Sequence, residues 1–315
     1  MNASLTVPTT FWRPRSGCGP GCLPPVGTLP AAGPLTPVLR LAGVLAMLLT
    51  GVFLLVLLPV LPRRLRPVAG SRWARGLLRA FGVRLRLAGR LPRQPALLAA
   101  NHISWLDTLA ILAVAPVRML AKSEVGRWPM IGSLARVGGT LFIDRDRPRT
   151  LPRTVAQVAA ALRAGSHVAV FPQGTTTCGI MERFPAGDGC ASGRRDPVPF
   201  RPALFQAAVD AGAPVVPLTL TYHFASRPAG RPVPASVPVP APVPVPVPVP
   251  TSVTAFIGEE ALWPSARRIL ALRHLVVTVD AGVPLRPDRV PHRRALARLA
   301  DPAAGPIRSA LDLVA

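Results

Sequence analysis

The chain has 315 residues, of which 50% are hydrophobic, so it is long enough to bury one substantial domain core and to carry additional segments. Its formal net charge is +23, almost all of it from arginine, which predicts attraction to an anionic surface, either nucleic acid or a lipid leaflet. Aromatic residues make up only 5% of the chain and Tyr222 is the single tyrosine, which argues against a protein that stacks on nucleic-acid bases.

The aspartates and cysteines of the chain do not have the sequence spacing that is typical of metal ligands. Asp144 and Asp146 are flanked by arginines, which favours salt bridges over metal binding. A chain of this length does not need a disulfide framework, so a reducing compartment is expected. The sequence therefore predicts no metal site, because its four cysteines lack the paired Cys-x-x-Cys spacing that zinc sites use: Cys18, Cys22, Cys178 and Cys190.

The N-terminal part divides into a polar lead and an apolar run. Residues 1–34 are rich in proline, glycine and threonine without periodicity, which predicts a disordered lead. The stretch from Leu41 to Leu61 carries no charge, and a helix of that length spans roughly the 30 Å hydrocarbon core of a bilayer. Residues 35–67 are therefore expected to hold a transmembrane or membrane-embedded helix with a basic flank, with a half-inserted hairpin as a variant. A buried core helix and a cleaved signal are the alternatives, although a signal has a shorter apolar region nearer the N-terminus.

Arginines gather on the C-terminal side of this apolar run. Six lie between residues 63 and 79, against three before the run: Arg13, Arg15 and Arg40. Because positive charge favours the cytoplasmic side of a membrane, this excess predicts that the bulk of the chain lies in the cytoplasm at the cell membrane. The same arginines are expected to hold the domain against anionic lipid.

Residues 68–230 alternate short apolar runs with helical stretches, which predicts βα units around a central sheet. The expected strands are residues 83–89, 95–100, 117–122, 139–145, 167–174 and 214–222. The expected helices are residues 106–115, 154–165 and 203–212, of which the last two are closed by a glycine.

Residues 231–252 form a low-complexity insertion in which proline alternates with valine. Proline lacks the N–H group that a strand ladder needs, so this segment predicts a polyproline-II rod and not an interior strand. A spacer loop and a partner-docking element are the two interpretations. Strand character resumes at residues 253–258 and 275–285, and residues 253–315 are expected to complete the core and to end in short helices or a tail.

Polar residues interrupt the otherwise apolar stretch AANHISWLDTLA, residues 99–110. Positions i and i+5 of an ideal helix are about 140° apart, so His102 and Asp107 can meet only if the histidine precedes a helix and the aspartate lies in its first turns. Asn101 or Ser104 is then the expected helix cap. The pair is either part of a capped helix start or a catalytic dyad, in which Asp107 accepts from one imidazole nitrogen and the other nitrogen is left as a base.

Two further polar clusters follow apolar strands. Arg145 ends the stretch GGTLFIDR, and the Gly174–Thr175 turn ends the stretch FPQGT. Because ligands bind outside the carboxyl ends of parallel strands, these clusters are expected to converge with His102 at one edge of the sheet. An arginine and exposed backbone N–H groups suit a phosphate. A base, an anion cradle and a membrane tether together indicate chemistry on the hydroxyl of a phospholipid-like molecule.

The four stretches NHISWLD, GGTLFIDR, FPQGTTT and VVPLTL, in this order, resemble the four blocks of the lysophosphatidate (1-acylglycerol-3-phosphate) acyltransferase family. The resemblance runs over residues 80–225 and continues to about residue 285. It implies an α/β, glycerol-3-phosphate acyltransferase-like fold with a mixed central sheet flanked by helices. It also implies an O-acyltransferase of phospholipid synthesis.

The resemblance implies that His102 deprotonates the free glycerol hydroxyl, which attacks the thioester of acyl-CoA or acyl carrier protein, while Asp107 orients the imidazole. It implies no bound cofactor and no covalent acyl-enzyme. The implied partners are a membrane lysolipid, the thioester donor and an anionic membrane surface, and not nucleic acid. The implied substrate-binding residues are Gly139, Phe142, Arg145, Gln173, Gly174, Thr175, Thr176 and Pro217.

Two residues depart from the family's third block, which reads Phe-Pro-Glu-Gly-Thr-Arg. Gln173 replaces the glutamate, which keeps the size and the acceptor carbonyl but removes a charge. Thr176 replaces the arginine, and this loss weakens the expected grip on an acceptor phosphate. A different lysolipid, such as a lyso-aminolipid, is therefore a second candidate acceptor, and a non-catalytic membrane module is the alternative function. The arginines that could supply the missing charge are Arg183, Arg194, Arg195 and Arg201.

Overall fold

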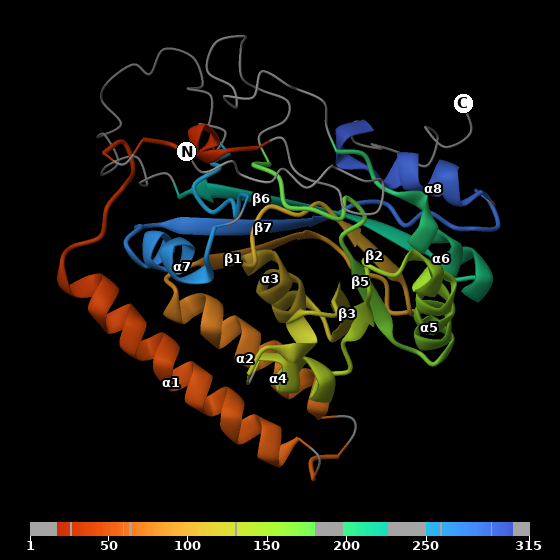
Figure 1. Cartoon of the computed structure of the whole chain (residues 1–315), viewed down its shortest axis with the longest axis horizontal. Coiled ribbons are helices and arrows are strands. Elements are labelled where there is room, and N and C mark those ends of the chain that lie inside the picture. Colours follow the sequence, from red (N-terminus) through yellow and green to blue (C-terminus); the bar gives the residue numbers. More distant parts are fainter. Residues whose placement is uncertain are drawn as a thin grey trace, which may run out of the picture.

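The structure is a computed structural model of the chain, shown in Figure 1. The residues that it describes are 18–25, 27–58, 60–62, 65–129, 131–179, 198–225, 250–258, 260–290 and 292–304. The proline-valine insertion expected at residues 231–252 lies outside the described residues, except for its last three.

Among the described residues, seven strands form one mixed sheet in the order β1-β7-β6-β2-β5-β3-β4. Neighbouring strands are parallel, except that β6 and β7 are antiparallel, which confirms the predicted mixed sheet. The strands are β1 (Arg84–Gly89), β2 (Leu97–Ala100), β3 (Val117–Lys122), β4 (Leu141–Ile143), β5 (His167–Val170), β6 (Val215–Phe224) and β7 (Leu275–Ala281).

Helices cover both faces of this sheet (Figure 1). The α-helices are α1 (Leu35–Leu57), α2 (Arg66–Ala80), α3 (Leu106–Val114), α4 (Ile131–Val137), α5 (Leu151–Arg163), α6 (Gln206–Ala211), α7 (Leu262–Leu270) and α8 (Arg293–Ala300). Short 3₁₀ helices are η1 (Pro20–Cys22), η2 (Val125–Arg127), η3 (Pro148–Thr150), η4 (Pro202–Phe205) and η5 (Pro302–Ala304).

The central strands β2 and β5 are buried on both faces, and alternate residues divide between two cores. In β2, Leu98 points into the core formed with α2, α3 and α7, whereas Leu97 points into the core formed with α5, α6 and α8. Both side chains are fully buried. This two-sided burial explains why the parallel strands are near-continuous apolar runs without polar alternation.

Helix α1 packs against α2 along one side and leaves its other side open (Figure 1). Trp73 of α2 donates a hydrogen bond from Nε1 to the carbonyl of Met47 at 2.8 Å, and its indole lies against Gly51 of α1. On the open side, Leu39, Leu49 and Val56 are 72%, 71% and 74% exposed. Within the described residues, α1 is the helix long and apolar enough to cross a membrane.

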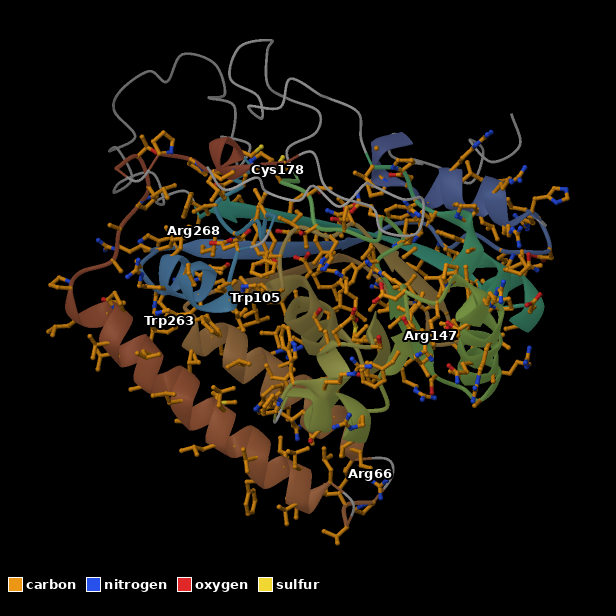
Figure 2. The ribbon with its side chains drawn as sticks, in the orientation of Figure 1. Arg66, Trp105, Arg147, Cys178, Trp263 and Arg268 are labelled. Atoms are coloured by element: carbon orange, nitrogen blue, oxygen red, sulfur yellow. The ribbon has the colours of Figure 1, made fainter. Side chains whose placement is uncertain are left out.

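Residues 253–258, expected to be a strand, are a turn in the structure. Their backbone groups are used elsewhere, because the Arg268 side chain donates to the carbonyls of Val253 at 2.8 Å and Ala255 at 3.0 Å. The N–H group of Phe256 donates to the carbonyl of Ile103 at 2.9 Å. Figure 2 shows Arg268 projecting from α7 toward this segment. The apolar pattern predicted the burial of this segment correctly, but the predicted strand is wrong. The backbone groups of the segment bond to Arg268 and Ile103 and not to a neighbouring strand.

Residues 18–34 belong to the stretch expected to be disordered, yet their described part has a defined path. Ala31 forms an isolated β-bridge with Leu272, and the N–H of Ala32 donates to the carbonyl of Ala271 at 2.7 Å. Leu23 and Leu29 pack against the α2–α3 core. These long-range contacts, which no local pattern reveals, give the segment its order.

Candidate active site

The three polar clusters meet at one edge of the sheet. Strands β2, β5, β3 and β4 are mutually parallel, so their carboxyl ends lie on the same side. His102 follows β2, the turn at residues 171–177 follows β5, and Arg145 follows β4. This arrangement confirms the expected convergence and places a candidate site where parallel sheets bind ligands.

Asn101 continues the strand pairing beyond the end of β2. Its side-chain amide donates to the carbonyl of Leu220 at 3.0 Å and accepts from the N–H of the same residue at 2.7 Å. The side chain therefore takes the place of a strand residue opposite β6 and is not the helix cap that the sequence suggested. Ser104 is the closer match to that expectation, because its Oγ accepts from the N–H of Leu106 at 3.3 Å.

His102 and Asp107 form a hydrogen-bonded pair. His102 lies in the turn before α3 and Asp107 is the second residue of that helix, as the spacing required. The distance from His102 Nδ1 to Asp107 Oδ2 is 2.9 Å. Because a carboxylate accepts, Nδ1 carries the proton and Nε2 keeps a lone pair. Within the described residues Nε2 makes no hydrogen bond, and the histidine side chain is 21% exposed, so the lone pair can reach a substrate.

Asp107 is fully buried and its carboxylate is satisfied by four donors. Besides His102, the backbone N–H groups of Ile103 and Ser104 donate to Oδ2 at 2.6 and 2.8 Å. The Tyr222 hydroxyl donates to Oδ1 at 2.6 Å. Hydrogen bonds to the charged form offset the cost of burying a carboxylate. The same contacts fix the turn that carries His102, so the aspartate both orients the imidazole and builds its support.

Tyr222 remains a hydrogen-bond donor to this carboxylate across the working pH range. Burial raises the pKa of its phenol well above the usual range, and the adjacent negative charge of Asp107 raises it further. The tyrosine comes from β6, which extends six residues beyond the Ala100–Leu218 register with β2. This extension brings Tyr222 over the start of α3.

Phe171 packs against one face of the His102 imidazole. Its ring stacks on His102 with centroids 3.9 Å apart and an angle of 12° between the planes. Phe171 and Tyr222 were both missed as site residues by sequence reasoning. The available signals were that Phe171 opens the third block and that Tyr222 is the only tyrosine of the chain.

The third block supports the His102 turn mainly through backbone contacts. Gln173 Oε1 accepts from the N–H of His102 at 2.9 Å, and Gln173 Nε2 donates to the carbonyl of Val198 at 3.3 Å. Thr177 donates its N–H to the carbonyl of His102 at 2.8 Å. The Thr176 hydroxyl donates to the carbonyl of Phe256. The side chains at the two departures from the family pattern, Gln173 and Thr176, are thus bonded to this chain's own backbone.

Gln173→Glu is expected to destabilise the fold. The side chain is 7% exposed, so a second carboxylate oxygen would face the Val198 carbonyl in place of the amide donor. The loss of this buried hydrogen bond costs about 1–3 kcal/mol. Thermal unfolding should therefore occur at a lower temperature than in the wild type. The exposed Gln157→Glu on α5 is the matched control and should leave the melting temperature unchanged. A wild-type melting temperature for Gln173→Glu would contradict its role in supporting the His102 turn.

Arg145 joins the second block to the third. Its guanidinium donates to the carbonyl of Gly174, a residue with φ of +76° that favours glycine at this turn. Burial lowers the pKa of Arg145; the nearby Glu124 carboxylate opposes this effect, and the positive charge of Arg201 reinforces it. Arg201 is held over the same block, since its N–H donates to the carbonyl of Pro172 at 3.2 Å. Two arginines therefore bring positive charge to this edge of the sheet.

Three of the predicted substrate-binding residues lie away from the dyad. Gly139 precedes β4 and therefore lies at the opposite end of that strand from Arg145, where its carbonyl accepts from Arg118 at 2.6 Å. Phe142 lies within β4 with its ring against Gly126. Pro217 lies within β6 opposite Ala99. Thr175 lies in the third-block turn, with Gln173 and Gly174.

The fold and site define a class: an α/β protein with a hydrogen-bonded His–Asp pair and two arginines at the carboxyl ends of parallel strands. The acyltransferase family model matches residues 83–221 of this chain, which confirms the resemblance over this range. The matched range contains both blocks that hold the His102–Asp107 pair and its supporting turn.

Curated relatives fall into two named groups. The 1-acyl-sn-glycerol-3-phosphate acyltransferase of Neisseria meningitidis serogroup B is 36% identical over 151 residues, covering 47% of this chain and 53% of that protein. The lyso-ornithine lipid O-acyltransferase of Rhizobium meliloti is 41% identical over 119 residues, covering 38% of this chain and 40% of that protein. The chain thus spans about half the length of the first of these relatives, and less of the second.

A solved structure supports the fold. The 1-acyl-sn-glycerophosphate acyltransferase of Thermotoga maritima superposes with a TM-score of 0.51 at 17% sequence identity, covering 83% of this chain and 92% of that one. The match covers more of the chain than the family model does and supports the mixed α/β fold.

Proposed function

We propose that the chain transfers a fatty acyl group from a thioester donor, acyl-CoA or acyl carrier protein, to the free hydroxyl of a lysolipid. The observation that carries this proposal is the buried Asp107 carboxylate with four donors, which holds the His102 imidazole with Nε2 facing outward. A helix cap alone needs neither the tyrosine donor nor the stacked ring of Phe171. These contacts favour a working base over a structural histidine.

The reaction balances with these residues alone. His102 Nε2 takes the proton of the lysolipid hydroxyl as its oxygen attacks the thioester carbonyl. Asp107 stabilises the imidazolium that forms. The tetrahedral intermediate collapses, the carbon–sulfur bond breaks, and the imidazolium returns the proton to the departing thiolate. An ester and a free thiol result, and no acyl-enzyme is formed.

The acceptor proposed first is 1-acylglycerol-3-phosphate, which would yield phosphatidate. Arg145 and Arg201 support an anionic headgroup, because their mutual repulsion is relieved when a phosphate lies between or beside them. A lyso-aminolipid is the second candidate, because Thr176 replaces the arginine of the family's third block and the named relatives include lyso-ornithine lipid O-acyltransferases.

We further propose that the domain works at the cytoplasmic face of the cell membrane, embedded through the open side of α1. The exposed leucines of α1 supply an apolar face, while Trp73 and Met47 join α1 to α2 and so to the domain. This packing favours the membrane-embedded variant over a helix that leaves the domain to cross the bilayer. The arginines of α2 would meet anionic headgroups.

Arg201→Ala is expected to weaken binding of a phosphate-bearing acceptor. Loss of a hydrogen bond to a charged group costs about 1.5–3 kcal/mol, so the KM for 1-acylglycerol-3-phosphate should rise about tenfold or more while kcat changes little. Initial rates would be measured with a panel of lysophosphatidate, other lysophospholipids and a lyso-aminolipid, with each donor, in detergent-phospholipid micelles.

The matched control is Arg147→Ala. Arg147 is 79% exposed and forms a surface ion pair with Asp144 at 3.7 Å, so its removal lowers the chain's charge equally without touching the site (Figure 2). An equal rise in KM for both variants would indicate a general charge effect and contradict an acceptor site at Arg201. If the wild-type protein prefers the lyso-aminolipid, that lipid replaces 1-acylglycerol-3-phosphate as the proposed acceptor. If the wild-type protein transfers acyl groups to no lysolipid, the proposed function is wrong.

A further inference from the structure

Residues 253–257 connect the turn before α3 with the third block of the site. The Phe256 N–H donates to the carbonyl of Ile103 at 2.9 Å, and the Phe256 carbonyl accepts from the Thr176 hydroxyl. The N–H of Ile103 in turn donates to Asp107 Oδ2 at 2.6 Å. The two backbone groups of Ile103 therefore bond to the Asp107 carboxylate on one side and to Phe256 on the other.

The guanidinium of Arg268, on α7, holds this stretch in place. The stretch is neither helix nor strand, so no regular pattern of backbone hydrogen bonds fixes it. Arg268 Nε donates to the carbonyl of Val253 at 2.8 Å, and Nη2 donates to the carbonyl of Ala255 at 3.0 Å. Glu260 binds the same guanidinium through both carboxylate oxygens, at 2.6 and 3.1 Å. This bidentate ion pair fixes the plane of the guanidinium and hence the direction of its remaining donors.

Helix α7 also contacts the first block directly. The indole Nε1 of Trp105 donates to the Ser265 hydroxyl at 3.2 Å, and Ser265 is fully buried. Ser265 and Arg268 are three residues apart, so they lie on the same face of the helix. Figure 2 labels Trp105 and Arg268 in this region. The face of α7 that holds residues 253–257 is therefore also fixed against the start of α3.

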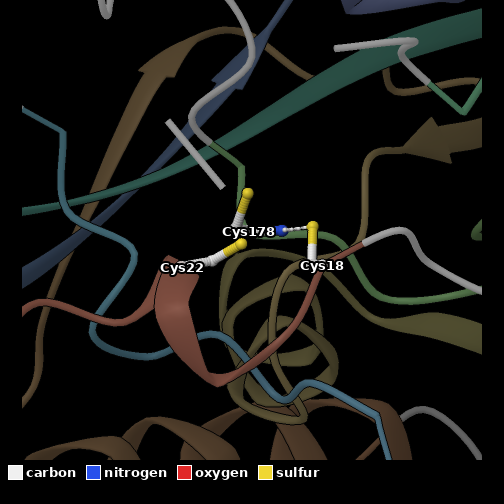
Figure 3. A group of neighbouring side chains, drawn as sticks. All are labelled: Cys18, Cys22 and Cys178. Atoms are coloured by element: carbon white, nitrogen blue, oxygen red, sulfur yellow. Dashed lines mark hydrogen bonds between the residues drawn. The ribbon is translucent and has the colours of Figure 1, made fainter. Parts of the chain in front are cut away.

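The N-terminal segment joins the same parts of the chain at a second point. The Ser252 hydroxyl donates to the carbonyl of Cys22 at 2.6 Å. The N–H of Cys178, two residues after Thr176, donates to Cys18 Sγ at 3.2 Å (Figure 3). The residue before this stretch is thus held by the N-terminal segment, whereas the Val253 and Ala255 carbonyls are held by Arg268.

We propose that Arg268 is a positioning residue for the His102–Asp107 pair. It fixes residues 253–257 and, through the Phe256 N–H, the Ile103 backbone that donates to the Asp107 carboxylate. Arg268 does not contact the pair, and it lies outside residues 83–221, which the family model matches. The proposal rests on the proposed function, in which this pair catalyses acyl transfer. A displacement of about 1 Å at the reacting groups can lower a rate about 100-fold, so a loose Ile103 turn should slow the reaction.

Arg268→Ala should lower kcat about 10- to 100-fold while the KM for the lysolipid stays within about twofold. The reason for this split is that the substitution changes the alignment of the base and not the contacts with the bound lipid. Initial rates would be measured below the melting transition of each variant. The matched control is Arg267→Ala, which removes the same charge from an exposed position on the same helix and should keep the wild-type kcat. Equal kcat values for the two variants would overturn the proposal.

Arg268→Lys separates the positioning role from loss of the fold. The lysine ammonium keeps the ion pair with Glu260, but it lacks the forked donors that hold the Val253 and Ala255 carbonyls together. Its melting temperature should lie closer to the wild-type value than that of Arg268→Ala, and its kcat should lie between the two. A wild-type kcat in Arg268→Lys would show that only the charge matters and would contradict the proposal.

A spectroscopic measurement tests the positioning role without relying on acyl transfer. A Nδ1 proton shared with a carboxylate gives a downfield proton resonance, which is assigned to His102 by its absence in His102→Ala. The protein is purified without reductant, so that the disulfide of Cys22 stays intact. The resonance should shift or be lost in Arg268→Ala and remain in Arg267→Ala. An unchanged resonance in Arg268→Ala overturns the positioning role, whereas a wild-type protein that shows this pattern but transfers no acyl group overturns only the proposed function.

Discussion

His102→Ala should abolish acyl transfer to lysolipids while the protein still folds and binds membranes. General-base catalysis contributes about 10²- to 10⁴-fold, and no second base within the described residues lies next to the Asp107 carboxylate. The backbone of residue 102 would keep its bonds to Gln173 and Thr177, because these use its N–H and carbonyl groups. Transfer of a radiolabelled acyl chain to lysophosphatidate, at matched protein levels in membranes, measures the loss.

The matched control for this experiment is His292→Ala. His292 is exposed at the start of α8, and only its backbone carbonyl is used, as an acceptor for the N–H of Leu296. This variant should keep wild-type transfer and wild-type membrane binding. Equal activity in His102→Ala and His292→Ala would show that the base lies elsewhere and would remove the proposed mechanism. Loss of membrane binding in His102→Ala would instead indicate an unfolded protein.

The dyad itself was predictable from sequence, but its surroundings were not. The spacing of His102 and Asp107 required a turn followed by a helix, and the structure contains both. Tyr222, in contrast, lies 115 residues from Asp107, and its contact exists only because β6 extends beyond β2. The length of a strand relative to its neighbours depends on sheet register, which no local pattern specifies.

The same distinction between local and long-range information explains the fold. Continuous apolar runs predicted the parallel strands correctly, because burial on both faces leaves no polar alternation. Residues 253–258 have a similar composition but bond to Arg268 and Ile103, so composition alone could not separate a buried turn from a strand.

The role of Gln173 shows how structure changes the meaning of a sequence departure. In the sequence, glutamine in place of glutamate indicated the loss of a charge at the substrate site. In the structure its two polar atoms contact backbone groups of His102 and Val198, which makes it a support of the turn. The residues expected to determine the acceptor are therefore Thr176 and Arg201, and no longer Gln173.

Asp107→Asn should lower the transfer rate about 100-fold or more while leaving the fold nearly as stable as the wild type. The asparagine oxygen can take the place of Oδ2 and keep the bonds from Ile103, Ser104 and His102, and its amide can donate to the Tyr222 hydroxyl oxygen. The negative charge that stabilises the imidazolium is lost, and the Tyr222 O–H loses its acceptor, so a small decrease in melting temperature is expected. A lower kcat with an unchanged KM, measured on the same lysolipid, is the expected result.

Two further variants separate the charge of Asp107 from its structural role. Asp107→Ala leaves two backbone N–H groups and a tyrosine hydroxyl unsatisfied in the core, at about 1–3 kcal/mol each, and should melt at a much lower temperature. Tyr222→Phe keeps the packed ring and the charge but removes one donor, so its rate should fall less than that of Asp107→Asn. If Asp107→Asn instead melts as low as Asp107→Ala, or transfers acyl groups at the wild-type rate, the carboxylate serves the turn and not the reaction.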